Sequence, residues 1–238
     1  MKGRNETVGR PELRPVPAAS FRMGNDAARS DERPAHAVTL APFRAAPRPV
    51  SNAEYARFVR ATGGEASPFL GDAAFADPGL PAVGVSWFEA VAYCDWLAAA
   101  TGLPLRLPSE AEREWAALGG LEAADWPWGD EAPAARPELV ELRRGEAPHL
   151  PTALCANGYG LLCMADNLHE WCSDWYDAAY YGSSPLEAPL GPAAGKRRAS
   201  RGGSWRHAVK FNRISSRSSL DPSYRYNDYG FRVYADAG

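Results

Sequence analysis

Glycine and proline interrupt this chain more often than long regular elements allow. The 238 residues include 22 glycines and 21 prolines, and each one inside a helix costs about 1–3 kcal/mol. Eight tryptophans and a hydrophobic content of 45% supply enough apolar surface to exclude a disordered chain. The sequence therefore predicts a loop-rich domain of the α+β class, with large aromatic side chains in its core, and argues against a helix bundle.

The charge and hydropathy of the chain limit which partners it can bind and where in the cell it is expected. The net charge is −3, which offers no electrostatic attraction for nucleic acid or an anionic membrane. No run approaches the roughly 18 apolar residues of a membrane span, and residues 1–17 lack the apolar stretch of a signal peptide. We expect a cytoplasmic protein that binds neither nucleic acid nor membrane, with a flexible segment over residues 1–19 and one domain over residues 20–238.

Regular structure is concentrated in the first half of the chain. Three Ser-x-x-Glu patterns match capping boxes, in which the serine and glutamate satisfy backbone amides at a helix start. They predict helices over 52–61, 87–100 and 110–118. A glycine follows each helix, where a left-handed cap ends it: Gly63, Gly102 and Gly119. Alternating apolar residues predict strands within 21–47, and only short, irregular strands are expected after residue 120.

Several ordered segments resemble the formylglycine-generating enzyme, or sulfatase-modifying-factor, family. They include PVSNAEYARFV at 49–59, VGVSWFEAVAYCDWL at 83–97, RLPSEAEREWAALGG at 106–120, NGYGLLCMADNLHEWCSDWY at 157–176 and RGGSWRH at 201–207. The match extends over about residues 20–236 with order and spacing retained. The resemblance implies a single C-type-lectin-like domain with little regular secondary structure, in which helices come early and irregular antiparallel strands come late.

The resemblance also implies where a copper site belongs. Catalytic members oxidise a substrate cysteine by using Cu(I) held between two cysteines after the Gly-Gly-Ser motif, and Cu(I) prefers thiolates. This chain has Val209 and Ile214 at the matching positions, and neither side chain binds metal. Its cysteines are Cys94, Cys155, Cys163 and Cys172, which we interpret as buried thiols. We therefore expect that copper is not bound and that Val209 and Ile214 are core residues.

A second metal is implied by the segment Cys163–Glu170. In the family the equivalent loop binds Ca²⁺ through oxygen atoms. The resemblance assigns the carbonyls of Asp166 and Leu168 and the carboxylate of Glu170 to a structural Ca²⁺, although Cys163 replaces a liganding asparagine. The alternative is that Glu170 only satisfies a turn by hydrogen bonding.

The histidines suggest a third kind of metal site. His169, Glu170 and His207 together have the donor types of an iron site. Adjacent residues point to different faces of an extended segment, however, so His169 and Glu170 are not expected to share one ion. His36 and His149 are expected at the surface.

Residues 205–229 are rich in side chains typical of binding sites. Arginine and tyrosine combine contact area with directional hydrogen bonds. We predict a C-terminal groove that binds a protein, a peptide or a small ligand. Its predicted ligand-binding residues are Trp205, Arg206, His207, Lys210, Asn212, Arg213 and Tyr226. Arg217, Asp228 and Arg232 are instead expected in a buried polar framework.

Three functions remain open. The absent cysteine pair favours a binding scaffold of immunity or regulatory type without oxidase activity. The alternatives are a metal- and oxygen-dependent oxidase that converts a sulfatase-type cysteine to formylglycine, and an accessory half of a non-haem iron sulfoxide synthase.

Overall fold

The computed structural model describes residues 8–142, 146–165, 167–208 and 211–237. Three helices carry the early part of the fold: α1 (Asn52–Thr62), α2 (Trp87–Thr101) and α3 (Glu110–Leu118). Each begins with the predicted capping box, and each ends at a glycine with positive φ. The three helix predictions are therefore confirmed to within one residue at each end. The sequence missed the short helix α4 (Pro137–Leu142).

Two antiparallel sheets contain the early strands and the C-terminal strand of the domain. The first has the order β1 (Arg14–Val16), β4 (Phe43–Ala45), β10 (Tyr234–Asp236) and β5 (Leu105–Arg106). The second pairs β2 (Ala19–Met23) with β3 (His36–Leu40). Within residues 1–19, which we predicted to be flexible, Arg14–Val16 pairs with β4. The ordered sheet therefore begins before residue 20.

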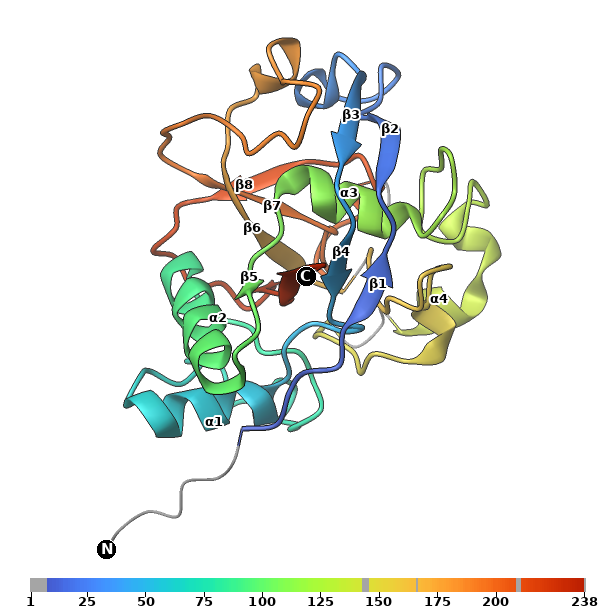
Figure 1. The fold of residues 1–238 in the computed structure, drawn as a ribbon. Helices are drawn as coiled ribbons and strands as arrows, with labels where there is room; N and C mark the ends of the chain where they lie inside the picture. The colour runs from blue at the N-terminus through green and yellow to red at the C-terminus, as the bar shows by residue number, and fades with distance from the viewer. Residues whose placement is uncertain (1–7, 143–145, 166, 209–210, 238) are drawn as a thin grey trace, which may run out of the picture.

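The third sheet positions the functional residues. Its order is β8 (Ser218–Leu220), β7 (Arg198–Arg201), β6 (His169–Trp175) and β9 (Tyr229–Gly230). Its pairs are antiparallel except β6 with β9, which run parallel. In Figure 1, α1 and α2 lie together at one end of the molecule, and β2 and β3 lie toward the opposite end. Together the elements confirm an α+β domain with mostly antiparallel strands.

The core is divided between two large aromatic clusters. One packs α1 and α2 against Trp171 and Phe231, and the other packs α3 against β2, β3 and β4. A third, smaller cluster contains Phe75, Leu168 and the partly buried Trp205. Because this third cluster holds Trp205, it anchors the start of the predicted binding loop to the core. Among the described residues, no helix has the length and apolar character needed to cross a membrane.

Candidate functional site

The Gly-Gly-Ser motif makes a turn that only glycine permits. Gly202 has φ +100° and Gly203 has φ +64°, a region that strains other residues. A Cβ atom on Gly202 would lie 2.9 Å from Nη2 of Arg113, and one on Gly203 would lie 2.9 Å from Cα of Asn212. The turn therefore packs directly against its surroundings and brings Ser204 close to the start of β6.

The parallel pairing of β6 with β9 brings two further polar residues to the same place. The backbone amide of His169 donates to the carbonyl of Asp228 over 2.9 Å, so the residues sit side by side at the start of each strand. The His169 ring stacks on Tyr229 with ring centroids 4.7 Å apart. This packing holds the imidazole in one orientation within the protein interior.

Four side chains then form a continuous polar chain. Ser204 Oγ donates to Asp228 Oδ2 over 2.9 Å and lies 3.2 Å from His207 Nδ1. That nitrogen is 3.1 Å from His169 Nε2. Burial, reinforced by the nearby His207, lowers the pKa of His169 to about 3. His169 is therefore neutral at pH 7, and its nitrogen lone pair is available to accept a hydrogen bond or bind a metal.

The same side chains have a donor set that fits a metal ion. One ligand atom from each of His169, His207 and Asp228 lies within 4.8 Å of the other two. Two imidazoles and one carboxylate are the donors of non-haem Fe(II) sites. Glu170 takes no part, because the side chains of His169 and Glu170 diverge, as the alternation along a strand predicts.

Several polar atoms here are buried without a hydrogen bond to any described residue. They are His169 Nδ1, Trp205 Nε1 and Asp228 Oδ1. Buried polar groups in native proteins are usually satisfied. Three such atoms around one loop therefore indicate a place where a ligand or water completes the hydrogen bonding.

Exposed side chains surround this polar chain. Arg206 is exposed; its Nη1 donates to Asn227 Oδ1 over 3.1 Å and lies 3.8 Å from Asp228 Oδ1. His207 is also exposed, whereas Trp205 is half-buried against Phe75. Tyr226 is 46% exposed. We call Trp205, Arg206, His207 and Tyr226 the recognition surface.

Other predicted groove residues lie elsewhere. Asn212 is fully buried and donates to the carbonyl of Ser204 over 3.3 Å, so its prediction as an exposed ligand-binding residue is wrong. Arg213 forms an ion pair with Glu32 over 2.8 Å, which directs it toward the N-terminal part of the fold. Lys210 lies outside the described residues.

The position matched to the second copper cysteine is part of the core. Ile214 is 5% exposed and packs in the cluster around α3, as predicted for a residue that fills space. Val209, matched to the first cysteine, lies outside the described residues.

Two arginines hold the carboxylate that was assigned to calcium. Glu170 accepts from Arg113 Nε over 2.9 Å, and from Arg232 Nε over 3.1 Å and Nη2 over 2.9 Å. All three side chains are buried. Both carboxylate oxygens therefore already have cationic partners, whose positive charge disfavours a divalent cation. This arrangement matches the hydrogen-bonding alternative, and the assignment of Glu170 to calcium stays a prediction. Leu168 is buried in the small third cluster, and Asp166 lies outside the described residues.

Buried ion pairs form a framework beneath the loop. Arg217 and Arg201 both pair with Glu110 at the start of α3, over 2.8 and 2.9 Å. With the Arg232–Glu170 pair, this confirms the prediction that Arg217 and Arg232 belong to a buried framework. Asp228 is buried too, but through Ser204 it also belongs to the polar chain.

A large hollow in the described structure lies away from the polar chain. Its volume is about 870 Å³. Most of the groups that line it are apolar, and they include Leu40, Trp87, Val91 and Leu190. Since none of His169, Ser204, His207 and Asp228 lines it, size alone does not locate the chemistry of this protein.

The fold and the loop define a class of protein: a loop-rich domain that presents a C-terminal Gly-Gly-Ser loop beside a parallel strand pair. The model of the sulfatase-modifying factor enzyme 1-like domain matches residues 3–237. The chain therefore belongs to the formylglycine-generating-enzyme-like, sulfatase-modifying-factor family.

Individual relatives cover nearly the whole chain. The formylglycine-generating enzyme of Streptomyces coelicolor is 34% identical, with 93% of this chain and 88% of that protein aligned. The inactive C-alpha-formylglycine-generating enzyme 2 of Mus musculus is 28% identical over 96% of this chain and 87% of that protein. The structure of PvdO from Pseudomonas aeruginosa superposes with a TM-score of 0.78 at 27% identity, covering 95% of this chain and 94% of PvdO.

Proposed function

We propose that this protein is a formylglycine-generating-enzyme-like binding scaffold without copper-dependent cysteine oxidase activity. The observation that carries the proposal is the chemistry of the loop after Gly-Gly-Ser. No cysteine occurs between residues 202 and 217, and Ile214 is committed to the core. Without a thiolate pair, this loop has no soft ligands for Cu(I). That a relative of similar length is an inactive enzyme by name supports the same conclusion.

The recognition surface is the part of the molecule suited to binding. Arg206 offers an exposed guanidinium that is only loosely paired with Asp228, at 3.8 Å. Tyr226 and the half-buried Trp205 add aromatic area beside it. Arginine, tyrosine and tryptophan are enriched among the residues that dominate the binding energy of protein interfaces. We infer a protein, peptide or small ligand with an acidic or hydrogen-bond-accepting group for Arg206.

The oxidase activity is tested with a Cys-x-Pro-x-Arg peptide. The protein is loaded anaerobically with Cu(I), exposed to oxygen, and assayed for a peptide aldehyde by hydrazide capture. We expect no aldehyde. Stoichiometric aldehyde production would overturn the proposal. Copper uptake alone is not the readout, because thiols elsewhere in the chain also bind Cu(I).

The binding role is tested by comparing two arginine substitutions. A partner recovered with the tagged full-length protein is purified and its affinity measured by calorimetry. Arg206→Ala should weaken binding at least about tenfold, within the range of an interface hot spot. Arg57→Ala, which removes an exposed arginine of α1, should leave the affinity unchanged. Equal affinities for both variants would contradict the placement of the surface. A partner that brings its own iron would support the accessory role instead.

The polar chain favours a second candidate, metal-dependent oxidation. His169, His207 and Asp228 fit a divalent ion such as Fe(II), which would supply oxygen-activating chemistry when bound. The residues of this chain would position the ion, and Ser204 would orient Asp228. Anaerobic Fe(II) binding at one equivalent, lost in His207→Ala but kept in His36→Ala, would support this candidate. Equal binding by both variants would exclude it.

A further inference from the structure

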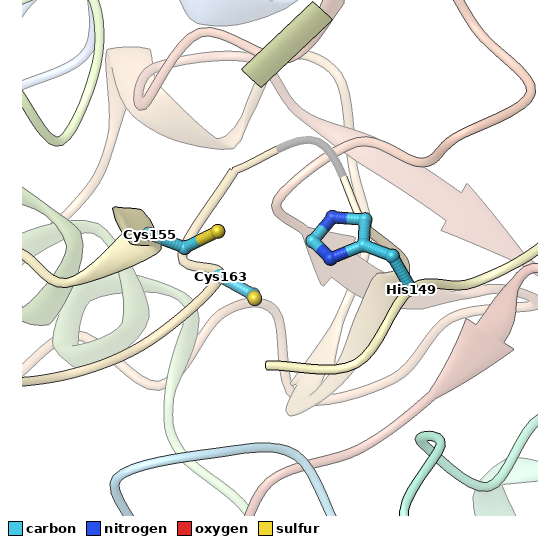
Figure 2. Close-up of side chains that lie close together, drawn as sticks. All are labelled: His149, Cys155 and Cys163. Atoms are coloured by element: carbon cyan, nitrogen blue, oxygen red, sulfur yellow. The ribbon is translucent and has the colours of Figure 1, made fainter. Parts of the chain in front are cut away.

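A second cluster of potential metal ligands lies outside the recognition surface. His149, Cys155 and Cys163 each place one ligand atom within 4.8 Å of the other two. Figure 2 shows both sulfur atoms close together and on the side facing the imidazole ring. We propose that these three residues form a zinc site that joins the two ends of the 149–163 segment.

The backbone between the two cysteines brings their side chains together. Cys155 ends the short 3₁₀ turn Ala153–Cys155, and Ala156 and Leu162 form an isolated antiparallel bridge. The amide of Cys163 donates to the carbonyl of Cys155 over 3.1 Å. Cys163 has φ +55°, a left-handed conformation that is unfavourable for a non-glycine residue. The chain thus adopts a strained conformation at the point that places the second sulfur.

The histidine is held as metal-binding histidines usually are. The Asn167 side chain accepts from the His149 amide over 3.1 Å and donates to the His149 carbonyl over 3.0 Å. The ring nitrogen Nδ1 lies 3.2 Å from the carbonyl of Leu150. A hydrogen bond to a carbonyl places the ring proton on Nδ1 and directs the lone pair of Nε2 outward, the usual arrangement in zinc sites.

The chemistry of this ligand set suits Zn²⁺. Two thiolates and one neutral imidazole make a complex with no net charge, which reduces the cost of burial. Cys163 and His149 are 2% and 8% exposed. Zinc bonds of about 2.0–2.3 Å put tetrahedral ligand atoms about 3.5–3.8 Å apart. Ligand atoms that lie up to 4.8 Å apart therefore need to approach one another by about 1.3 Å at most. A solvent oxygen would complete the tetrahedral coordination. On binding, each thiol gives up its proton to solvent and its sulfur donates an electron pair to the ion, with no change in oxidation state.

Cobalt titration tests the proposal without relying on a variant. Full-length protein is stripped with a chelator under reducing conditions and titrated with Co²⁺, then with Zn²⁺. We expect one equivalent of Co²⁺ with a strong thiolate-to-cobalt charge-transfer band in the near ultraviolet, which Zn²⁺ removes. Cobalt bound by His169, His207 and Asp228 has no sulfur ligand and lacks this band. Absence of the band would overturn the proposal.

Alkylation and substitution then identify the ligands. Zinc should protect Cys155 and Cys163 from iodoacetamide, as read by peptide mass spectrometry, without changing the labelling of Cys94 or Cys172. Loss of a residue that only supports a metal ligand reduces affinity by about 10–100-fold. Because Cys155 and Cys163 are themselves ligands in this proposal, Cys155→Ser and Cys163→Ser should each reduce zinc affinity by more than that. The control Cys94→Ala, in α2, should keep wild-type affinity. Zinc affinity unchanged in both serine variants, or a Cys155–Cys163 disulfide that zinc does not prevent under reducing conditions, would refute the site.

Discussion

Replacing Glu170 with glutamine tests whether the centre of the fold depends on an ion pair or on calcium. Burial raises the pKa of Glu170, but the charges of Arg113 and Arg232 outweigh burial and hold it below its usual value. Glu170→Gln keeps the side-chain shape and removes the negative charge, which leaves two buried guanidinium groups without a counter-charge. Removing one partner of a buried pair costs about 3–5 kcal/mol. At about 2–4 °C per kcal/mol for a domain of this size, Tm should fall by about 6–20 °C.

Urea unfolding followed by tryptophan fluorescence measures this loss, in parallel with EDTA and with Ca²⁺. We expect the same loss under both conditions. The control Asp26→Asn breaks the exposed pair Arg22–Asp26 and should change the free energy of unfolding by no more than about 1 kcal/mol. A Glu170→Gln loss below about 1 kcal/mol would refute the ion-pair argument. A loss seen only in Ca²⁺, with wild type equally weak in EDTA, would make Glu170 a calcium ligand after all.

Three further predictions concern stability. Gly203→Ala should lower the free energy of unfolding more than Gly63→Ala, as measured by urea midpoints. Both glycines have positive φ, but of the two only Gly203 has neighbouring atoms that a Cβ would meet. Equal losses of stability would contradict the packing argument. Ser51→Ala removes the cap of α1 and should lower the free energy of unfolding by about 1 kcal/mol. Ser184→Ala, at a half-buried serine outside the helices and strands, should not. Burial, with the charge of Glu110, raises the pKa of Asp174 to about 7, so the folded state keeps a proton that the unfolded state releases above about pH 4. Stability from this group therefore falls as pH rises from about 4 to about 7, and urea midpoints of Asp174→Asn should show a smaller fall over that range than wild type.

Local signals in the sequence predicted the helices well. A capping box needs only four consecutive residues, so Ser86 and Glu89 mark the start of α2 without knowledge of the rest of the fold. Strand β1 was missed for the opposite reason. Its three residues carry little pattern of their own, and they become a strand only because β4 offers a partner.

The site was predicted less completely because its contacts cross long stretches of chain. Arg206 and His207 are exposed, as predicted, but Asn212 is buried because Gly203 packs closely against it. No local sequence pattern predicted that Asp228, and not Glu170, would lie in the same ligand cluster as His169. That pairing depends on the parallel register of β6 and β9. His149 was expected at the surface, yet it is buried. The side chain of Asn167, 18 residues away, holds its backbone in place through two hydrogen bonds.

The segment from Gly202 to Arg217 is held in place by its buried residues and not by its exposed ones. At one end the glycines pack against Arg113 and Asn212; at the other, Arg217 pairs with Glu110 over 2.8 Å. The side chains that project outward, such as Arg206, contribute little to either fastening. The fold can therefore present different surface chemistries at this position on an unchanged frame, which makes the stretch from Arg206 to Ala208 a suitable place to graft a new specificity.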